Sequence, residues 1–127
     1  MPWFHAHRQE YETYIRKPFF DFIEALSPAL SQISGDMELR PGKCLARINR
    51  DIRYTRDKSP YRDHLWALFR RSGEARETSV VYWFELSPET VEWGLGFWGP
   101  NRPAMDVLRE QMVQKPAVIR RVLRSSG

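Results

Sequence analysis

Residues 79–98 read SVVYWFELSPETVEWGLGFW, and this stretch decides the expected fold. Apolar side chains alternate with other residues on both sides of Ser87-Pro88-Glu89-Thr90, where proline holds the position that a type I turn favours. Alternation with a period of two is typical of a strand that packs one face on a core. The stretch therefore predicts an antiparallel β-hairpin.

The second arm of this hairpin carries two glycines, Gly94 and Gly96, on one face. Because glycine has no side chain, this face would be a shallow floor that a ligand or another backbone approaches closely. A helix packed over the glycines also satisfies the pattern, and we favour that interpretation. We expect the tryptophans of the hairpin to be mostly core residues. If they were exposed instead, they would form an apolar patch typical of an interaction domain. They are Trp83, Trp93 and Trp98.

Upstream, the segment 3–33 has apolar residues three and four positions apart, which is typical of an amphipathic helix. Pro18 and Pro28 interrupt the pattern, since proline removes an amide donor and clashes with the preceding turn. We therefore expect one kinked helix, or two short helices meeting near Pro18, with a break at Ser27-Pro28.

Between this helix and the hairpin, the segment 44–55 alternates apolar and polar residues, which predicts another half-buried strand. Arg50 falls among the apolar positions, so we expect a bulge or turn near it. Residues 56–63 are expected to form a loop ordered by Pro60. A further strand is expected at 65–69.

The C-terminal segment returns to a helical spacing after Pro100. Asn101 or Arg102 is placed to cap a helix, and Pro116 ends it before another turn or two of helix. A helix, then antiparallel strands, then helices is an α+β layout. We predict an α+β fold with an antiparallel sheet of about four strands, on which the kinked N-terminal helix and the C-terminal helices pack.

Length and composition fit a single globular domain over residues 1–127, with 42% hydrophobic and 13% aromatic residues. The single cysteine, Cys44, excludes an intrachain disulfide and agrees with a reducing compartment. No apolar run is long enough to span a membrane, and the N-terminus lacks the layout of a signal peptide. We therefore expect a cytoplasmic protein with no membrane partner.

Positive charge is concentrated in one part of the chain. Residues 40–64 contain eight Lys or Arg against three Asp, a net +5, whereas the whole chain carries +4. A local excess of this kind favours anionic partners through the field that it creates, although it is also common on a solvated face.

The best candidate site lies in residues 47–64, where these charges meet tyrosine and histidine. Guanidinium groups bind carboxylate or phosphate through two parallel hydrogen bonds, and lysine adds a point charge. The working hypothesis is an anion- or phosphate-recognising domain with a basic strand-plus-loop site. The anion-binding candidates are Arg47, Arg50, Arg53, Lys58 and Tyr61, supported by Asp51, Asp57 and His64.

Two other interpretations of the same residues stay open. The aspartates would neutralise the arginines if the cluster were an internal ion-pair network of a structural or interaction domain. Cations interleaved with Tyr54 and Tyr61 also fit a module that binds single-stranded nucleic acid. The partner we expect is a phosphate-bearing small molecule or a nucleic acid, and the oligomeric state is left open.

No motif assigns a reaction, so whether the chain is an enzyme stays open. Ser59, His64 and Asp51 or Asp63 are the residue types of a hydrolytic triad, but the Gly-x-Ser-x-Gly turn is missing. Pro60, directly after the serine, has no amide to stabilise an oxyanion. The glycines of a phosphate loop and the spacing of metal ligands are also missing. We expect no metal and no cofactor.

Residues 47–53 form the motif Arg-x-x-Arg-Asp-x-Arg, and Asp57-Lys58-Ser59-Pro60-Tyr61 follows. Together with Trp3-Phe4 and Gly94-Leu95-Gly96, these residues resemble an uncharacterised, mainly bacterial family of conserved hypothetical proteins, a domain of unknown function. The resemblance implies no activity. Compared with that family the chain looks shortened at both ends, so we expect a shortened version of a longer domain.

Overall fold

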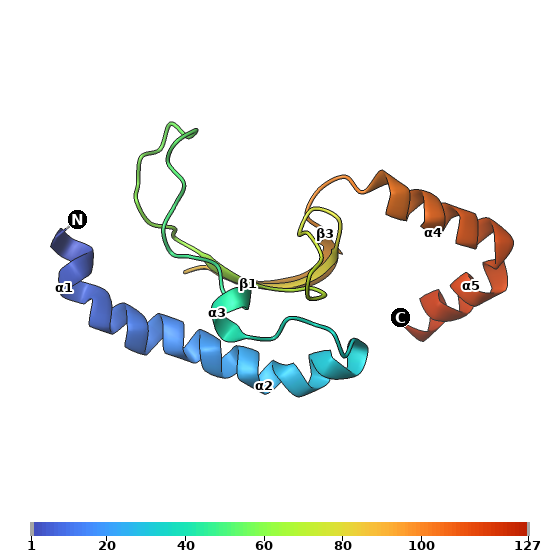
Figure 1. Ribbon diagram of the computed structural model, residues 1–127, viewed down its shortest axis with the longest axis horizontal. Helices are drawn as coiled ribbons and strands as arrows, with labels where there is room; N and C mark the ends of the chain where they lie inside the picture. Colours follow the sequence, from blue (N-terminus) through green and yellow to red (C-terminus); the bar gives the residue numbers. More distant parts are fainter. Residues whose placement is uncertain (1, 127) are drawn as a thin grey trace.

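The computed structural model describes residues 2–126, in which a sheet lies on a long N-terminal helix and two helices follow at the C-terminal end (Figure 1). The elements are α1 (Pro2–Tyr11), η1 (Glu12–Arg16), α2 (Lys17–Ile33), α3 (Pro41–Cys44), β1 (Leu65–Phe69), β2 (Val80–Leu86), β3 (Val91–Phe97), α4 (Arg102–Gln114) and α5 (Pro116–Ser125). The predicted α+β class is confirmed. None of the helices in this described part is long and apolar enough to cross a membrane.

The N-terminal helix is irregular where the sequence predicts a kink. η1 has π-helical geometry, and α2 then begins with Pro18 in its first turn. The predicted break at Ser27-Pro28 is wrong, because α2 continues through Pro28. Ile23 and Leu30, on either side of this proline, are buried against the sheet. Their packing holds the helix together although proline removes one backbone hydrogen bond.

β1, β2 and β3 form an antiparallel sheet in that order. The hairpin predicted at residues 79–98 is β2 and β3, with Trp83 opposite Gly94. Ser87 closes its turn: the Ser87 amide donates to the Thr90 carbonyl, and the Ser87 hydroxyl accepts from the Thr90 amide, each over 2.9 Å. The strand predicted just upstream of the hairpin is β1.

The core lies between α2 and one face of β1 and β2. Its buried side chains are Phe19, Ile23, Leu30, Cys44, Leu65, Ala67 and Phe69, and none of the residues packed around them comes from β3. The expectation that the hairpin tryptophans are mostly core residues is therefore wrong. Trp93 is 73% exposed, because α2 does not extend over the third strand. Trp98 is 50% exposed on the opposite face, just after the end of β3.

The other face of the sheet carries Gly94 and Gly96. The helix that we expected over these glycines packs on the opposite face instead, as the core residues of α2 show. The ring of Trp83 lies against Gly94: a Cβ added at this glycine would come within 2.9 Å of the ring. A Cβ at Gly96 would meet nothing within 4 Å. This face is therefore open beside Gly96.

The segment before β1 does not form the strand predicted at 44–55, so the sheet has three strands. A one-turn helix, α3, takes up the start of the segment. Leu45 then makes an isolated bridge with Ala67 at the free edge of β1, and the Ala46 amide donates to the Trp66 carbonyl over 2.9 Å. The segment runs beside the sheet without forming a ladder.

Residues 49–61 fold back on themselves as an irregular loop that projects from the sheet (Figure 1). Asn49 bridges to Tyr61, and the Arg50 amide donates to the Pro60 carbonyl over 2.9 Å. Pro60 has no amide to donate in return, so the pairing stops there. The alternation of the sequence thus ends in a loop instead of a strand.

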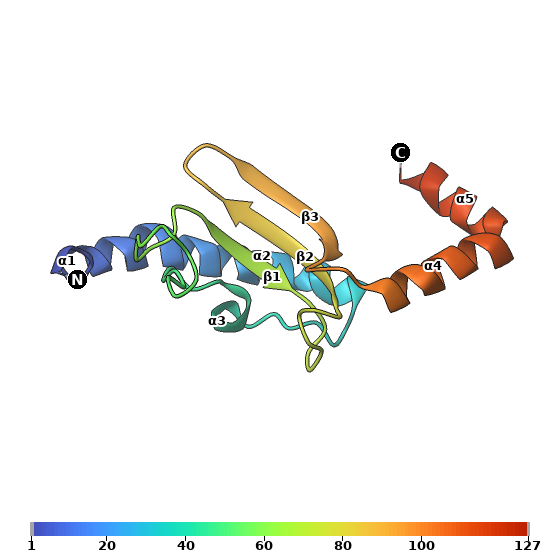
Figure 2. The ribbon, with the colours of Figure 1, turned by 90° about the horizontal axis from the view of Figure 1, so that it is seen from above.

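α4 and α5 extend away from the sheet (Figures 1 and 2). Asn101 caps α4 as predicted, since its Oδ1 accepts from the Ala104 amide over 3.2 Å. Its Nδ2 donates to the Thr78 carbonyl over 2.8 Å, which fixes the start of α4 at the end of the sheet. The prediction that these two helices pack on the sheet is wrong. They contact each other, because the chain leaves β3 through Gly99-Pro100 in an outward direction.

Candidate anion-binding cleft

A cleft of about 700 Å³ lies along the free edge of β1. Its walls come from three parts of the chain: Glu38 with residues of α3 and of the segment 45–51, then Arg62 with Trp66 and Leu68, and finally Arg70 and Arg76. The hydrogen bond from Ala46 to the Trp66 carbonyl holds the first wall against the strand. The edge of the sheet therefore fixes the position of the cleft, which we call the basic cleft.

Cations dominate the charged lining of this cleft. They are Lys43, Arg47, Arg50, Arg62, Arg70 and Arg76. In the described part of the chain only two of these six form ion pairs, Arg50 with Asp57 and Arg76 with Glu77. The other four have no carboxylate partner there. Their charges add to a positive potential in the cleft, which favours an anion.

Two carboxylates also line the cleft, and each is already paired with an arginine outside it. Glu38 pairs with Arg40. Asp51 accepts three hydrogen bonds from Arg53, over 3.0 Å from Nε, 2.7 Å from Nη2 and 3.2 Å from the amide. These bonds are the main cause that lowers the pKa of Asp51 to about 2. Both carboxylates thus make their direct ion pairs outside the cleft, although the charge of Asp51 also acts on Arg62 and that of Glu38 on Lys43.

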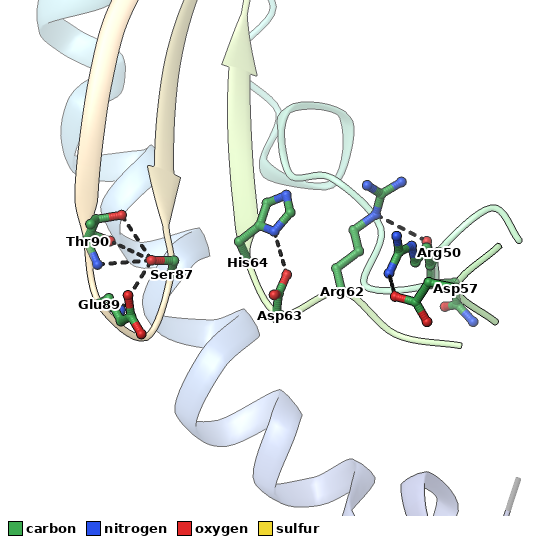
Figure 3. Close-up of polar contacts among 9 residues, drawn as sticks. Arg50, Asp57, Arg62, Asp63, His64, Ser87, Glu89 and Thr90 are labelled. Atoms are coloured by element: carbon green, nitrogen blue, oxygen red, sulfur yellow. Dashed lines mark hydrogen bonds and ion pairs between the residues drawn. The ribbon is translucent and has the colours of Figure 1, made fainter. Parts of the chain in front are cut away.

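Tryptophan rings hold two of the arginines in place. The guanidinium carbon of Arg62 lies 4.4 Å from the centroid of Trp66, and that of Arg76 lies 4.3 Å from the centroid of Trp98. The Arg62 Nε also approaches the carbonyl of Asn49, at 3.4 Å (Figure 3). Stacking on an indole stabilises a guanidinium and restricts its rotamers. Both arginines are thus pre-positioned at the rim of the cleft.

Arg50 crosses the loop 49–61 to pair with Asp57 (Figure 3). The Asp57 carboxylate also accepts from the hydroxyl of Ser59 over 2.6 Å and from its amide over 2.9 Å. The hydrogen bonds from Ser59, with a smaller contribution from Arg50, lower the pKa of Asp57. This part of the predicted site is an internal network that orders the loop.

The structure divides the residues proposed from the sequence into two groups. Arg47, Arg50 and Asp51 line the basic cleft. Arg53, Asp57, Lys58, Tyr61 and His64 lie outside its lining. The predicted site is therefore brought together only in part, and its centre shifts from the loop toward the edge of β1.

Lys58 and Tyr61 hold the loop 49–61 in place. The Lys58 Nζ donates to the Ile52 carbonyl over 2.8 Å. The ring of Tyr61 stacks on Phe4 with centroids 4.6 Å apart, which joins the loop to α1. These contacts fix the loop beside the N-terminal helix.

His64 lies on the face of the sheet next to the cleft. Its Nδ1 is 2.7 Å from the Asp63 carboxylate, a contact that lowers the pKa of Asp63 (Figure 3). Its ring stacks on Trp66 with centroids 5.4 Å apart. Ser59 bonds to Asp57 instead, so the serine and the histidine have separate carboxylate partners.

Four cations of the cleft were missed as site residues from the sequence: Lys43, Arg62, Arg70 and Arg76. Arg62 and Arg70 carried a usable signal, because steps of two residues through β1 place them on the same face as Trp66 and Leu68. Arg76 follows no periodic pattern, since it lies in the connection between β1 and β2. Only the fold brings it to the cleft.

Cys44 lines the cleft but is buried and carries a weakly acidic thiol. Burial, with the nearby carboxylate of Glu38, raises the pKa of Cys44 to about 11. Its Sγ donates to the carbonyl of Glu38 over 3.2 Å. A thiol in this state is a poor nucleophile near neutral pH. Within residues 2–126, no group of three His, Cys, Asp or Glu residues is placed to hold a metal ion.

Comparison with protein families gives one finding for the whole chain. A family model described as "Conserved hypothetical protein (DUF2461)" matches residues 1–127. Comparisons with curated proteins and with solved structures find no significant match. The resemblance carried by the motifs of residues 47–61 is thus confirmed, and the description of the family names no activity.

Proposed function

Since the chain belongs to this conserved hypothetical family, whose description names no activity, we propose a function from its own residues: the basic cleft binds a small phosphate-bearing anion. The observation that carries the proposal is the set of cations without carboxylate partners at one sheet edge. They are Lys43, Arg47, Arg62 and Arg70.

Like charges held close together repel one another unless an anion lies between them. Here the two carboxylates that line the cleft, Glu38 and Asp51, are paired with other arginines. An anion that enters the cleft would therefore gain attraction from several cations without displacing an internal carboxylate. Binding of this kind relieves a repulsion already present in the free protein.

Phosphate suits this cleft better than a single carboxylate does. A phosphate group offers three oxygens, and guanidinium groups bind pairs of them with parallel hydrogen bonds. Arg62 is already restricted by its stack on Trp66, so it loses less side-chain entropy when it binds. Arg47 and Lys43 belong to another segment of the lining. The cleft thus offers planar guanidinium donors together with the point charge of a lysine.

Two alternatives make different predictions for the same cations. A nucleic-acid module would bind oligonucleotides more tightly as they lengthen, with affinity that falls steeply with salt. A purely structural network would bind no anion at all. The ion pairs of Arg50 and Arg53 support a structural role for the loop, whereas the unpaired cations of the cleft favour a ligand.

Calorimetric titration with inorganic phosphate and pyrophosphate tests the proposal. We expect saturable binding with one site, which Arg47→Ala and Arg62→Ala each weaken by about tenfold, the scale of a charge-assisted hydrogen bond. The matched control is Arg120→Ala, which removes the same charge from an exposed position of α5. Equal losses in all three variants, or no binding by the wild type, would contradict the proposal.

We also place the protein in the cytoplasm. Support comes from its single cysteine, Cys44, which is a free and buried thiol and agrees with a reducing compartment.

A further inference from the structure

A second cavity, of about 340 Å³, lies on the face of the sheet opposite α2 and adjoins the basic cleft. We call it the aromatic pocket. Its main lining residues are Trp66, Leu68, Val81, Trp83, Gly96 and Trp98. Nearly all of them come from the three strands, whose alternation places these side chains on one face. The pocket is therefore built on the most regular part of the fold.

Glycine makes room in this pocket. A Cβ at Gly96 would meet no atom within 4 Å, so the space above it is open. The neighbouring Gly94 is different, because the Trp83 ring lies directly over it. The pocket thus has a backbone floor at Gly96 beside an indole side wall. Apolar walls around a bare backbone floor suit a flat ring.

The aromatic pocket and the basic cleft share Trp66 and Leu68 in their linings. Arginine–tryptophan stacks also connect them. Arg62 belongs to the cleft and rests on Trp66, while Arg76 belongs to the cleft and rests on Trp98 of the pocket. An anionic group held by Arg76 would therefore have the Trp98 end of the aromatic pocket beside it.

Two carboxylates line the far side of the pocket. Glu85 and Glu92 are directly opposite each other on neighbouring strands. In the described part of the chain neither takes part in an ion pair or a side-chain hydrogen bond. Like charges in this position destabilise a sheet. They mark the end of the pocket away from Gly96, because Gly94 and the Trp83 ring lie between Glu92 and Gly96.

From this arrangement we propose that the ligand is a purine nucleoside phosphate. The inference rests on the proposed function, since the phosphate occupies the basic cleft. The base lies in the aromatic pocket over Gly96, where Trp83 and Trp98 also line the pocket. A purine offers a larger face for stacking on an indole than a pyrimidine does. Guanosine phosphates therefore bind more tightly than uridine phosphates.

Ribose 5-phosphate is the matched probe, because it keeps the phosphate and the sugar of GMP but lacks the base. Calorimetric titrations of the wild type with GMP, UMP, ribose 5-phosphate and pyrophosphate separate the two parts of the site. Base stacking on aromatic side chains accounts for about a tenfold gain in affinity or more. We expect GMP to exceed ribose 5-phosphate by at least about that factor, and UMP to lie between them.

Gly96→Val fills the floor of the pocket without touching the cleft. This variant should reduce GMP affinity to that of ribose 5-phosphate and leave pyrophosphate binding unchanged. Val91→Leu, on the opposite face of the same strand, is the control and should change neither.

The possible failures are distinguishable. Equal affinities for GMP and ribose 5-phosphate, with intact pyrophosphate binding, would overturn the nucleoside inference and leave the anion proposal standing. Tighter binding of a short oligonucleotide than of GMP, increasing with length, would also overturn it in favour of a nucleic-acid partner. Absence of binding by every phosphate compound would overturn both.

Discussion

Arg62 and Trp66 form the contact that joins the two halves of the candidate site. The guanidinium of Arg62 lies over the indole at 4.4 Å from its centroid, and the two residues are four positions apart on the extended chain that enters β1. Arg62 lines the basic cleft, while Trp66 lines both the cleft and the aromatic pocket. The stack therefore places a cation where the charged and apolar surfaces meet.

Replacing Trp66 with leucine removes the stack while keeping an apolar side chain on the sheet. Cation–π contacts at partly exposed sites contribute about 0.5–1 kcal/mol, so we expect pyrophosphate affinity to fall by about two- to fivefold. Trp93→Leu is the control, since Trp93 is 73% exposed on the other face. If calorimetry finds the same affinity in both variants, Trp66 does not position Arg62.

The two glycines of β3 should respond differently to the same substitution. Gly94→Ala would bring a methyl group to within 2.9 Å of the Trp83 ring, and overpacking of this kind costs about 1–3 kcal/mol. Gly96→Ala meets nothing within 4 Å and removes a flexible residue from a strand, so it should be neutral or stabilising by about 0.5 kcal/mol. Urea denaturation measures both; the reverse order would show that Trp83 does not lie over Gly94.

Because Asp51 pairs with Arg53, we expect the free energy of unfolding to fall at acidic pH. The pKa of Asp51 is lowered to about 2, so the folded state holds this proton less tightly than the unfolded state, whose Asp pKa is about 3.9. The stabilising contribution is complete above that unfolded value and is lost as the pH falls toward about 2. Because the pair is exposed, the effect is small and screened by salt.

Urea denaturation near neutral pH and at about pH 3 tests this dependence. Asp51→Asn should lose less stability on acidification than the wild type does. Glu89→Gln, at the exposed turn of the hairpin, is the matched control and should behave like the wild type. If acidification lowers the free energy of unfolding of Asp51→Asn as much as that of the wild type, folding does not lower the Asp51 pKa.

Cys44 should react slowly with alkylating reagents in the folded protein. Its pKa is raised to about 11, mainly by burial, and the thiolate is the reactive form. Alkylation by iodoacetamide near neutral pH should therefore be at least about tenfold slower than in urea, where the thiol regains its usual pKa near 8.5. Mass spectrometry follows the reaction. Equal rates with and without urea would show that Cys44 is accessible in the fold.

The sheet was predictable because its signals are local. The alternation of residues 79–98, and the proline at position 88, determine both arms and the turn of the hairpin without help from distant residues. The cap at Asn101 and the helix start at Pro116 are equally local. Such signals depend only on neighbouring residues, so the sequence alone predicts these elements.

Other features depend on tertiary contacts and were missed. The segment 44–55 alternates like a strand, but the missing amide of Pro60 and the loop closed by Arg50 and Asp57 prevent a ladder. Pro28 does not break α2, because burial of Ile23 and Leu30 outweighs one lost hydrogen bond. In each case packing overrides a local preference.

The candidate site shows the same division. Arg47 and Arg50 were found from the density of charge alone, and both line the cleft. Arg70 shares the face of Trp66 and Leu68, whereas Arg76 comes to the cleft only through the connection between β1 and β2. Sequence reasoning identified the kind of chemistry but not the full set of side chains, since the cations come from three separate segments.

The most direct test of the central claim is a titration with pyrophosphate followed by NMR of protein labelled with nitrogen-15 at arginine. Resonances are assigned by single substitutions. The account predicts that the Nε–Hε signals of Arg47, Arg62 and Arg70 shift together and saturate at one equivalent of ligand, while those of Arg120 and Arg121 on α5 stay unchanged. Shifts of equal size at all five arginines, or none in the cleft, would contradict it.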